Sequence, residues 1–114
     1  MTDRAFLGEF EQMMLAAVLR LGDQAYGAAI LTEIAAQTGR HVSSGALYVT
    51  LDRLEDKGLI ETRRADPTPE RGGRPKRFVR VTPEGLEALR DVREALLKLW
   101  RGIEDRLETA KPRS

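Results

Sequence analysis

The sequence predicts a mainly α-helical protein with a small β-hairpin and a long C-terminal helix. Three observations carry this prediction. Apolar residues recur at helical spacing through the first half of the chain. Two short strand-like segments flank a stretch rich in proline and glycine, and a heptad-like leucine pattern occupies the last quarter. A chain of 114 residues, of which 41% are apolar, has the size of one compact domain.

The composition excludes several classes of chemistry. The chain has no cysteine, which rules out disulfides, thiolate metal sites and cysteine nucleophiles. His41 is the only histidine, and because no second ligand or base lies near it, we expect ordinary polar surface there. No apolar run approaches the roughly 20 residues of a membrane span, and the N-terminus lacks a signal-peptide pattern. We therefore expect a cytoplasmic protein without membrane contact that is not an enzyme and holds no metal ion or cofactor.

The first two helices are expected over residues 5–21 and 26–37. The first has an apolar stripe with the i, i+3, i+4, i+7 spacing, and this stripe leaves Glu11 on the solvent side. The second is rich in alanine, which permits the close helix–helix approach that a helix-turn-helix needs. The stripe of the first helix comprises Phe6, Phe10, Met13, Met14, Ala17, Val18 and Leu21.

A third helix is expected within residues 43–60. Its start has two candidate N-cap serines, its leucines recur on one face, and Gly58 is placed to end it. The other face carries Gly45, Tyr48, Val49, Asp52 and Arg53. A short helix with a buried leucine face, an open polar face and small residues at its start suits insertion into a DNA major groove. The alternative is an ordinary amphipathic surface helix.

The hairpin is expected to join strands at residues 59–63 and 77–81 through a proline-rich tip. The net charge of the chain is only +1, yet residues 63–80 hold seven basic and two acidic residues, which makes this segment +5 and the remainder −4. A local basic patch on an otherwise acidic protein points to a polyanionic partner. The basic residues are Arg63, Arg64, Arg71, Arg74, Lys76, Arg77 and Arg80.

The last helix is expected to begin with Thr82 as N-cap and Pro83 in its first turn, and to run without a break to about Leu107. Its apolar residues step by three and four, as in a coiled-coil seam. Because a small domain cannot cover so long a stripe, we expect a second copy to do so. The seam comprises Leu89, Val92, Leu96, Leu99 and Ile103, and it is widened by Leu86, Leu97, Trp100 and Leu107.

Four stretches together resemble the PadR family of bacterial transcriptional regulators. They are YGAAILTEI (26–34), SSGALYVTLDRLEDKGLI (43–60), GGRPKRFVRVTPEG (72–85) and the leucine-rich helix that follows. The resemblance implies a winged helix-turn-helix over residues 1–81, a dimerisation helix over 82–108 and a disordered tail over 109–114. It also implies a homodimer that binds double-stranded DNA, usually as a repressor. The single C-terminal helix is similar to that of the shorter members of the family.

Site residues follow from the resemblance and from the helix and hairpin described above. The residues expected at DNA are Ser43, Ser44, Gly45, Tyr48 and Arg53 on the third helix, and Arg71, Gly72, Gly73, Arg74 and Lys76 on the wing. Tyr48 could instead be a half-buried packing residue, and Arg53 could pair with Asp56. Two copies would read a pseudopalindrome with half-sites about 34 Å apart.

Regulation by a small effector is also implied by the resemblance. A flat aromatic or phenolic molecule would bind between the dimer helices, where Phe6, Phe10 and Trp100 are the aromatic residues able to line a site. The alternative for Trp100 is packing in the dimer seam. The alternative for the whole protein is a winged-helix interaction module whose basic hairpin binds an acidic protein partner.

Overall fold

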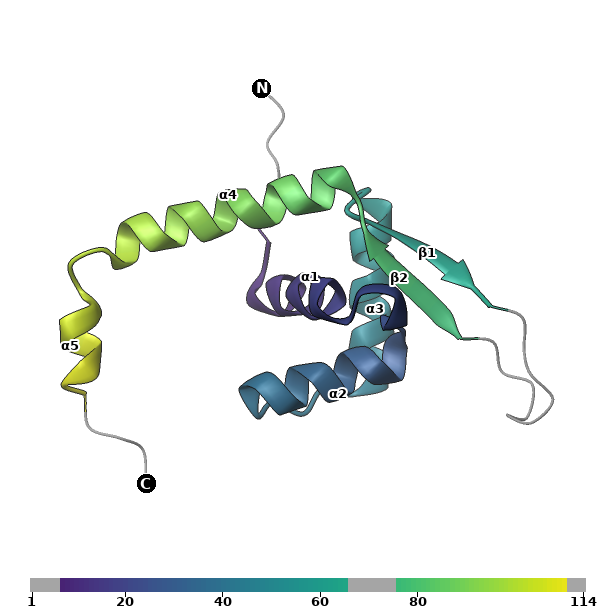
Figure 1. Cartoon of the computed structure of the whole chain (residues 1–114), viewed down its shortest axis with the longest axis horizontal. Helices are drawn as coiled ribbons and strands as arrows, with labels where there is room; N and C mark the ends of the chain where they lie inside the picture. The colour runs from purple at the N-terminus through teal and green to yellow at the C-terminus, as the bar shows by residue number, and fades with distance from the viewer. Residues whose placement is uncertain (1–6, 66–75, 111–114) are drawn as a thin grey trace.

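The computed structural model describes residues 7–65 and 76–110. It confirms a mainly α-helical fold with one two-stranded antiparallel hairpin. In Figure 1, helices α1 to α3 and the hairpin form the body of the molecule, from which α4 extends and ends in the turned segment α5. The elements are α1 (Glu9–Leu21), a 3₁₀ turn (Gly22–Gln24), α2 (Gly27–Thr38), α3 (Ser44–Asp56), β1 (Ile60–Arg64), β2 (Arg77–Val81), α4 (Pro83–Trp100) and α5 (Glu104–Glu108).

The core lies between α1, α2, α3 and the inner face of the hairpin. The predicted leucine face of α3 is confirmed, since its three leucines are fully buried. Leu15, which the predicted stripe of α1 omits, is also fully buried, whereas Phe10 and Met13 are only partly buried against the core. The largest fully buried side chains are Met14, Leu15, Ile30, Leu47, Leu51 and Leu54.

Glu11 corrects the predicted stripe, because its side chain is buried and not turned to solvent. Its carboxylate accepts a hydrogen bond from the Gly8 N–H at 2.9 Å, which forms a capping box at the start of α1. The same carboxylate pairs with Lys57 Nζ at 3.0 Å, at the end of α3. Burial raises the pKa of Glu11, but the Gly8 N–H, the Lys57 ammonium and the more distant Arg53 together hold it below its usual value. Glu11 therefore joins the two helices as an ionised group.

Both ends of α3 are fixed by local hydrogen bonds, as the sequence predicts. The Ser43 hydroxyl oxygen accepts a bond from the Ala46 N–H at 3.1 Å. At the other end Gly58 has a φ of +76°. The Gly58 N–H donates to the Glu55 carbonyl at 2.9 Å and the Leu59 N–H to the Leu54 carbonyl at 3.0 Å. This pair of bonds is the Schellman arrangement, which satisfies the last carbonyls of a helix.

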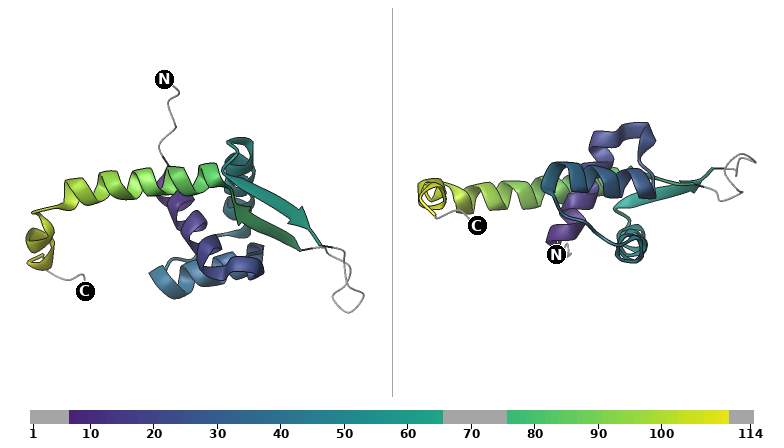
Figure 2. Two further views of the ribbon diagram at one scale, coloured as in Figure 1. Left: turned by 45° about the horizontal axis from the view of Figure 1, so that its top comes forward. Right: turned by 90° about the horizontal axis from the view of Figure 1, so that it is seen from below.

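The two strands of the hairpin pair from Ile60 opposite Val81 to Arg64 opposite Arg77. The segment before α2 adds a short third edge, because the Val79 N–H donates to the Ala25 carbonyl at 2.8 Å. Both views of Figure 2 show the hairpin projecting from the body on the side opposite to α5. The expected tip, with Arg71, Gly72, Gly73 and Arg74, lies outside the described residues.

The start of α4 is attached closely to the end of α3. The Thr82 hydroxyl donates to the Gly58 carbonyl at 2.7 Å and accepts from the Gly85 N–H at 3.0 Å, which confirms Thr82 as the N-cap. A β-carbon on Gly85 would lie 2.2 Å from the Leu59 carbonyl oxygen. Only glycine therefore allows the first turn of α4 to approach the chain so closely at this position.

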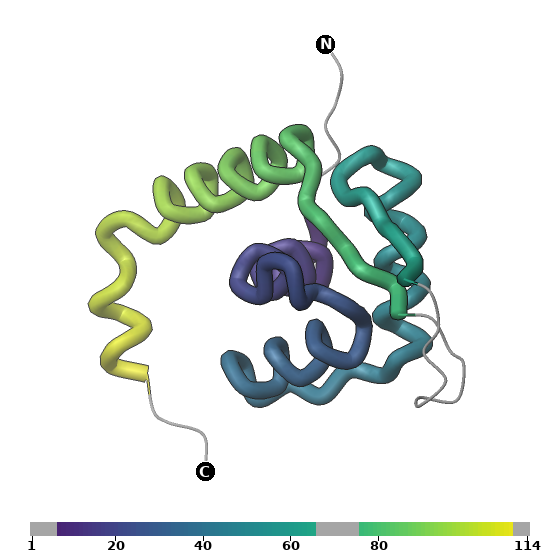
Figure 3. The backbone as a smooth tube through the Cα atoms, turned by 45° about the vertical axis from the view of Figure 1, so that its right-hand side comes forward, coloured from purple at the N-terminus to yellow at the C-terminus, as the bar shows by residue number. Residues whose placement is uncertain are grey.

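The C-terminal segment corrects the prediction of one unbroken helix. Helix α4 ends at Trp100, and a turn at residues 101–103 separates it from α5. Gly102 has a φ of +88°, a conformation that other residues rarely adopt. The leucine spacing continues through this position, so periodicity alone did not reveal the break. Figure 3 shows α5 turned away from the line of α4.

The expected disordered tail falls mainly on residues 111–114, which lie outside the described residues. Phe6, at the expected start of α1, lies outside them as well. Among residues 7–65 and 76–110, no helix has both the length and the apolar character needed to span a bilayer.

Candidate nucleic-acid interface

The exposed face of α3 is the centre of the candidate site. Its leucines are buried in the core, and its other side is open to solvent from Ser43 to Arg53. Figure 3 shows α3 and the hairpin on the side of the molecule away from α5. A helix held in this way by one face presents the other face as a ridge, which is the shape that enters a DNA major groove.

Tyr48 both packs and remains accessible. Its side chain is 41% exposed, and its hydroxyl lies against the start of α2, where a β-carbon on Gly27 would come within 2.6 Å of the oxygen. The first N–H groups of a helix have no partner within that helix. The Tyr48 hydroxyl thus lies beside the electropositive end of α2, and each of the two roles considered for it from the sequence describes one part of the side chain.

Arg53 is an exposed cation on the same face. The expected alternative, an ion pair with Asp56, is absent, and no hydrogen bond or ion pair of Arg53 is found within residues 7–65 and 76–110. Its guanidinium group is therefore available for an anion or for the edge of a base.

Arg77, which the sequence places in the basic patch, binds the hairpin to α3. Its side chain is only 14% exposed, and its Nη2 atom lies 3.0 Å from Asp52 Oδ1 and 3.1 Å from Glu55 Oε1. The Thr62 hydroxyl donates to the other Glu55 oxygen at 2.8 Å. These contacts fix the position of the strands relative to α3. The signal in the sequence was the pair of carboxylates three residues apart on α3, but only the strand register shows which cation they meet.

Other hairpin cations lie over aromatic rings or pair with a carboxylate. Arg80 pairs with Glu61. Lys76 Nζ lies 4.2 Å from the ring centroid of Tyr26, and the Arg63 guanidinium carbon lies 5.0 Å from that of Phe78. The two rings are in edge-to-face contact with centroids 5.6 Å apart. Cation–π contacts leave the positive charge able to interact with an anion.

The positive charge that remains unpaired is therefore displaced toward the open end of the hairpin. Arg63, Arg64 and Lys76 have no carboxylate partner in the described part of the chain, whereas Arg77 and Arg80 do. The basic patch predicted from the sequence is smaller than its count of basic residues suggests.

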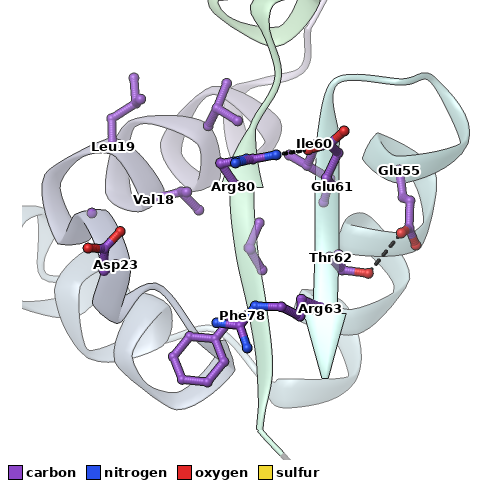
Figure 4. Close-up of a pocket in the computed structure, with 13 residues that line it drawn as sticks. Val18, Leu19, Asp23, Glu55, Ile60, Glu61, Thr62, Arg63, Phe78 and Arg80 are labelled. Carbon is purple, nitrogen blue, oxygen red and sulfur yellow. Dashed lines mark hydrogen bonds and ion pairs between the residues drawn. The ribbon is translucent and has the colours of Figure 1, made fainter. Parts of the chain in front are cut away.

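A groove of about 790 Å³ runs between the end of α1 and the hairpin (Figure 4). Its walls combine the apolar residues Val18, Leu19 and Phe78 with the Arg80–Glu61 pair. Neither this groove nor the rest of the described chain contains a group of histidine, cysteine and carboxylate side chains able to hold a metal ion.

The expected dimerisation residues divide into two sets. Leu89 and Val92 are partly buried against the core of their own chain. The distal residues are exposed to between 40% and 74%: Leu96, Leu97, Leu99, Trp100, Ile103 and Leu107. Of the aromatic residues expected at an effector site, Phe10 packs against the core and Trp100 is 45% exposed near the far end of α4. Within the described chain these two rings make no ring contact.

Comparison with known proteins agrees with this arrangement. A model of the PadR-like family of transcriptional regulators matches residues 15–91. The chain is 43% identical over 75 residues to the transcriptional regulator Rv3488 of Mycobacterium tuberculosis, and the match spans 64% of this chain and 64% of that relative.

Solved structures also resemble the chain. A PadR family transcriptional regulator from Eggerthella lenta superposes with a TM-score of 0.60 at 30% identity, covering 87% of each chain. A transcriptional regulator from Clostridium thermocellum shares the fold, with a TM-score of 0.67, 24% identity and coverage of 82% of this chain and 85% of that one.

The expectation that the protein is not an enzyme agrees with these matches, because the family consists of transcriptional regulators. The family model extends from the core of α1, through α2, α3 and the hairpin, into α4. On this match, and with the winged helical fold described above, the chain belongs to the PadR-like family of transcriptional regulators.

Proposed function

We propose that the protein is a sequence-specific DNA-binding repressor that acts as a homodimer and is released from DNA by a small effector. The observation that carries this proposal is the exposed face of α3 beside the unpaired cations Arg63, Arg64 and Lys76. A solvent-facing helix next to a cationic hairpin matches the two surfaces that a winged helix-turn-helix applies to DNA.

In this proposal α3 lies in the major groove. The small residues Ser43, Ser44 and Gly45 allow its start to approach the DNA closely, and Arg53 contacts a base edge or a phosphate. The Tyr48 hydroxyl donates to a phosphate beside the start of α2, where helix N–H groups favour negative charge. Lys76 and the tip residues 71–74 contact the backbone of the adjacent groove.

The dimer is supported by the exposed apolar residues beyond Val92. A single chain leaves six large apolar side chains exposed along the distal part of α4 and in the segment that follows. Exposed apolar surface of this extent is typical of an interface, and a twofold homodimer is the commonest solution. Two copies of α3 related in this way would read a pseudopalindromic operator with half-sites about 34 Å apart.

Effector binding is supported by the position of Trp100. Its ring is 45% exposed among these apolar residues, so a dimer could place it against Phe10 or Phe6 of either copy. A flat aromatic or phenolic molecule that bound one arrangement of the dimer better than another would shift the protein between a DNA-binding and a non-binding form. A fluorescence titration with phenolic acids tests this role, and an unchanged Trp100 signal would contradict it.

The proposed function is tested by footprinting the purified protein on its own upstream region, at two salt concentrations and with excess nonspecific competitor DNA. We expect a protected region with dyad symmetry that persists in the presence of competitor. Arg53→Ala should weaken binding at least tenfold, since charge-assisted contacts to DNA contribute about 1–3 kcal/mol each. Arg20→Ala is the matched control, because it removes one exposed positive charge from α1, away from α3.

Equal binding to every sequence, with no protected region, would contradict the proposal. That outcome would favour an interaction module whose hairpin binds an acidic protein partner. The internal pairs of Arg77 and Arg80 show that cations of this hairpin accept carboxylates.

A further inference from the structure

Val49 is an apolar residue in an unexpected place. Its side chain is 59% exposed, more than any other large apolar residue that the structure describes before α4. It lies in the middle of α3, where a β-branched residue loses side-chain freedom and is a poorer helix former than alanine or leucine. Neither helix formation nor packing in the core explains a valine at this position.

Gly45, one helical turn before Val49, is equally unexplained by the fold. A β-carbon on Gly45 would meet nothing closer than Ser43 Oγ at 4.0 Å, and the φ of Gly45 is not positive. Gly27 and Gly85 differ, because neighbouring atoms at 2.6 and 2.2 Å leave no room for a side chain there. The chain itself therefore does not require a glycine at position 45, although glycine is a poor helix former.

Gly45 and Val49 are four residues apart and so lie on one face of α3. Together they form a narrow apolar strip, which we call the Gly45–Val49 strip, between the hydroxyl of Tyr48 and the charges of Asp52 and Arg53. The strip is one side chain wide. That is too small for a protein partner, but it matches a single methyl group.

The major groove of DNA offers one apolar group of this size. Each base pair presents hydrogen-bond donors and acceptors there, and thymine alone adds a C5-methyl group. A side chain with methyl groups at the surface of the reading helix distinguishes thymine by contact with that methyl, provided that the helix backbone can come close enough. Glycine at position 45 removes the side chain that would hold the backbone away.

We propose that Val49, brought close by Gly45, contacts the C5-methyl of one thymine in each half-site and sets the preference for thymine at that position. This inference rests on the proposed function, namely that α3 reads DNA in the major groove. It assigns base selectivity to a residue that was not among the DNA-contacting residues expected from the sequence.

The test begins with selection of bound sequences from a random DNA library, using the whole protein. Each thymine of the selected site is then replaced singly by deoxyuridine, which removes only the methyl group. We expect one position per half-site at which the replacement weakens binding about fourfold, the value for one buried methyl-sized group. Val49→Ala should bind the thymine and uracil duplexes equally at this position.

Leu19→Ala is the control, because Leu19 is 47% exposed on α1, away from the Gly45–Val49 strip, and this variant should keep the preference for thymine. Val49→Thr retains one methyl group and should keep part of it. If Val49→Ala still discriminates, or if no uracil replacement affects the wild-type protein, the inference is wrong. If selection yields no preferred sequence, the proposed function fails as well, so the two failures are distinguishable.

Discussion

The body of the molecule and its distal arm differ in how completely one chain satisfies its own side chains. In the body, the leucines of α3 are fully buried, and no buried polar side-chain atom of the described residues lacks a hydrogen-bond partner. In the arm, which we define as residues 96–107, six large apolar side chains are at least 40% exposed. The body can therefore fold as a single copy, whereas the arm presents a surface that is complete only with a partner.

The largest effect is expected in the body. Leu51→Ala removes a fully buried side chain from α3 and should lower the free energy of unfolding by about 2–5 kcal/mol. Urea denaturation followed by circular dichroism measures this loss. A change below about 1 kcal/mol would show that α3 does not depend on the core for its position.

The corresponding change in the arm should act on assembly. Leu99 is 74% exposed, so Leu99→Ala should change the stability of a single chain by less than about 0.5 kcal/mol. Loss of a buried contact in both copies should weaken the dimer about tenfold or more. Sedimentation over a range of protein concentrations measures the association. Unchanged association together with reduced monomer stability would contradict the division between body and arm.

A smaller effect, dependent on pH, is expected at Glu11. Its pKa is lowered in the folded protein, so the ionised group stabilises the fold above its unfolded pKa, and this contribution is lost as the pH falls through the folded value. Glu11→Gln keeps an oxygen for the Gly8 N–H but loses the charge that faces Lys57. We expect a loss of about 1 kcal/mol at pH 7 that shrinks at acid pH, where the wild-type carboxyl is protonated. Thermal unfolding at pH 7 and pH 3 compares the two proteins, and a difference that did not depend on pH would exclude an ionised Glu11.

The smallest effect on stability is expected at the surface of α3, with the opposite sign. Gly45→Ala places a methyl group in open space and improves helix propensity, so it should raise the free energy of unfolding by up to about 1 kcal/mol. The same methyl should weaken specific DNA binding, because it separates the helix backbone from the bases. Melting and DNA-binding measurements on one preparation test both effects. A stabilised variant with unchanged DNA affinity would show that position 45 does not face DNA.

Local signals in the sequence were sufficient for most elements of the body. The N-cap residues Ser43 and Thr82, the helix-ending Gly58 and the strand at residues 77–81 all occur where the local pattern predicts them. These features depend on neighbours along the chain, so they can be read without knowledge of the fold.

Features that depend on distant residues could not be predicted in this way. Glu11 looks like a surface residue until Lys57, which is 46 residues away, is brought beside it. Arg77 looks like part of a cationic surface until the strand register sets it against Asp52 and Glu55. The break at Gly102 was missed for a different reason, because the leucine spacing on both sides outweighed one glycine in the helical pattern.

The attachment of α4 to α3 makes α4 a lever. Because the hydroxyl of Thr82 and the close approach of Gly85 fix the first turn of α4 to Gly58 and Leu59, the two helices turn together. Helix α4 has 18 residues and is about 27 Å long, so a displacement of about 2 Å at its far end corresponds to a rotation of about 5°. Rotation of each copy by this amount in the proposed dimer would alter the angle between the two reading helices without any change inside the body.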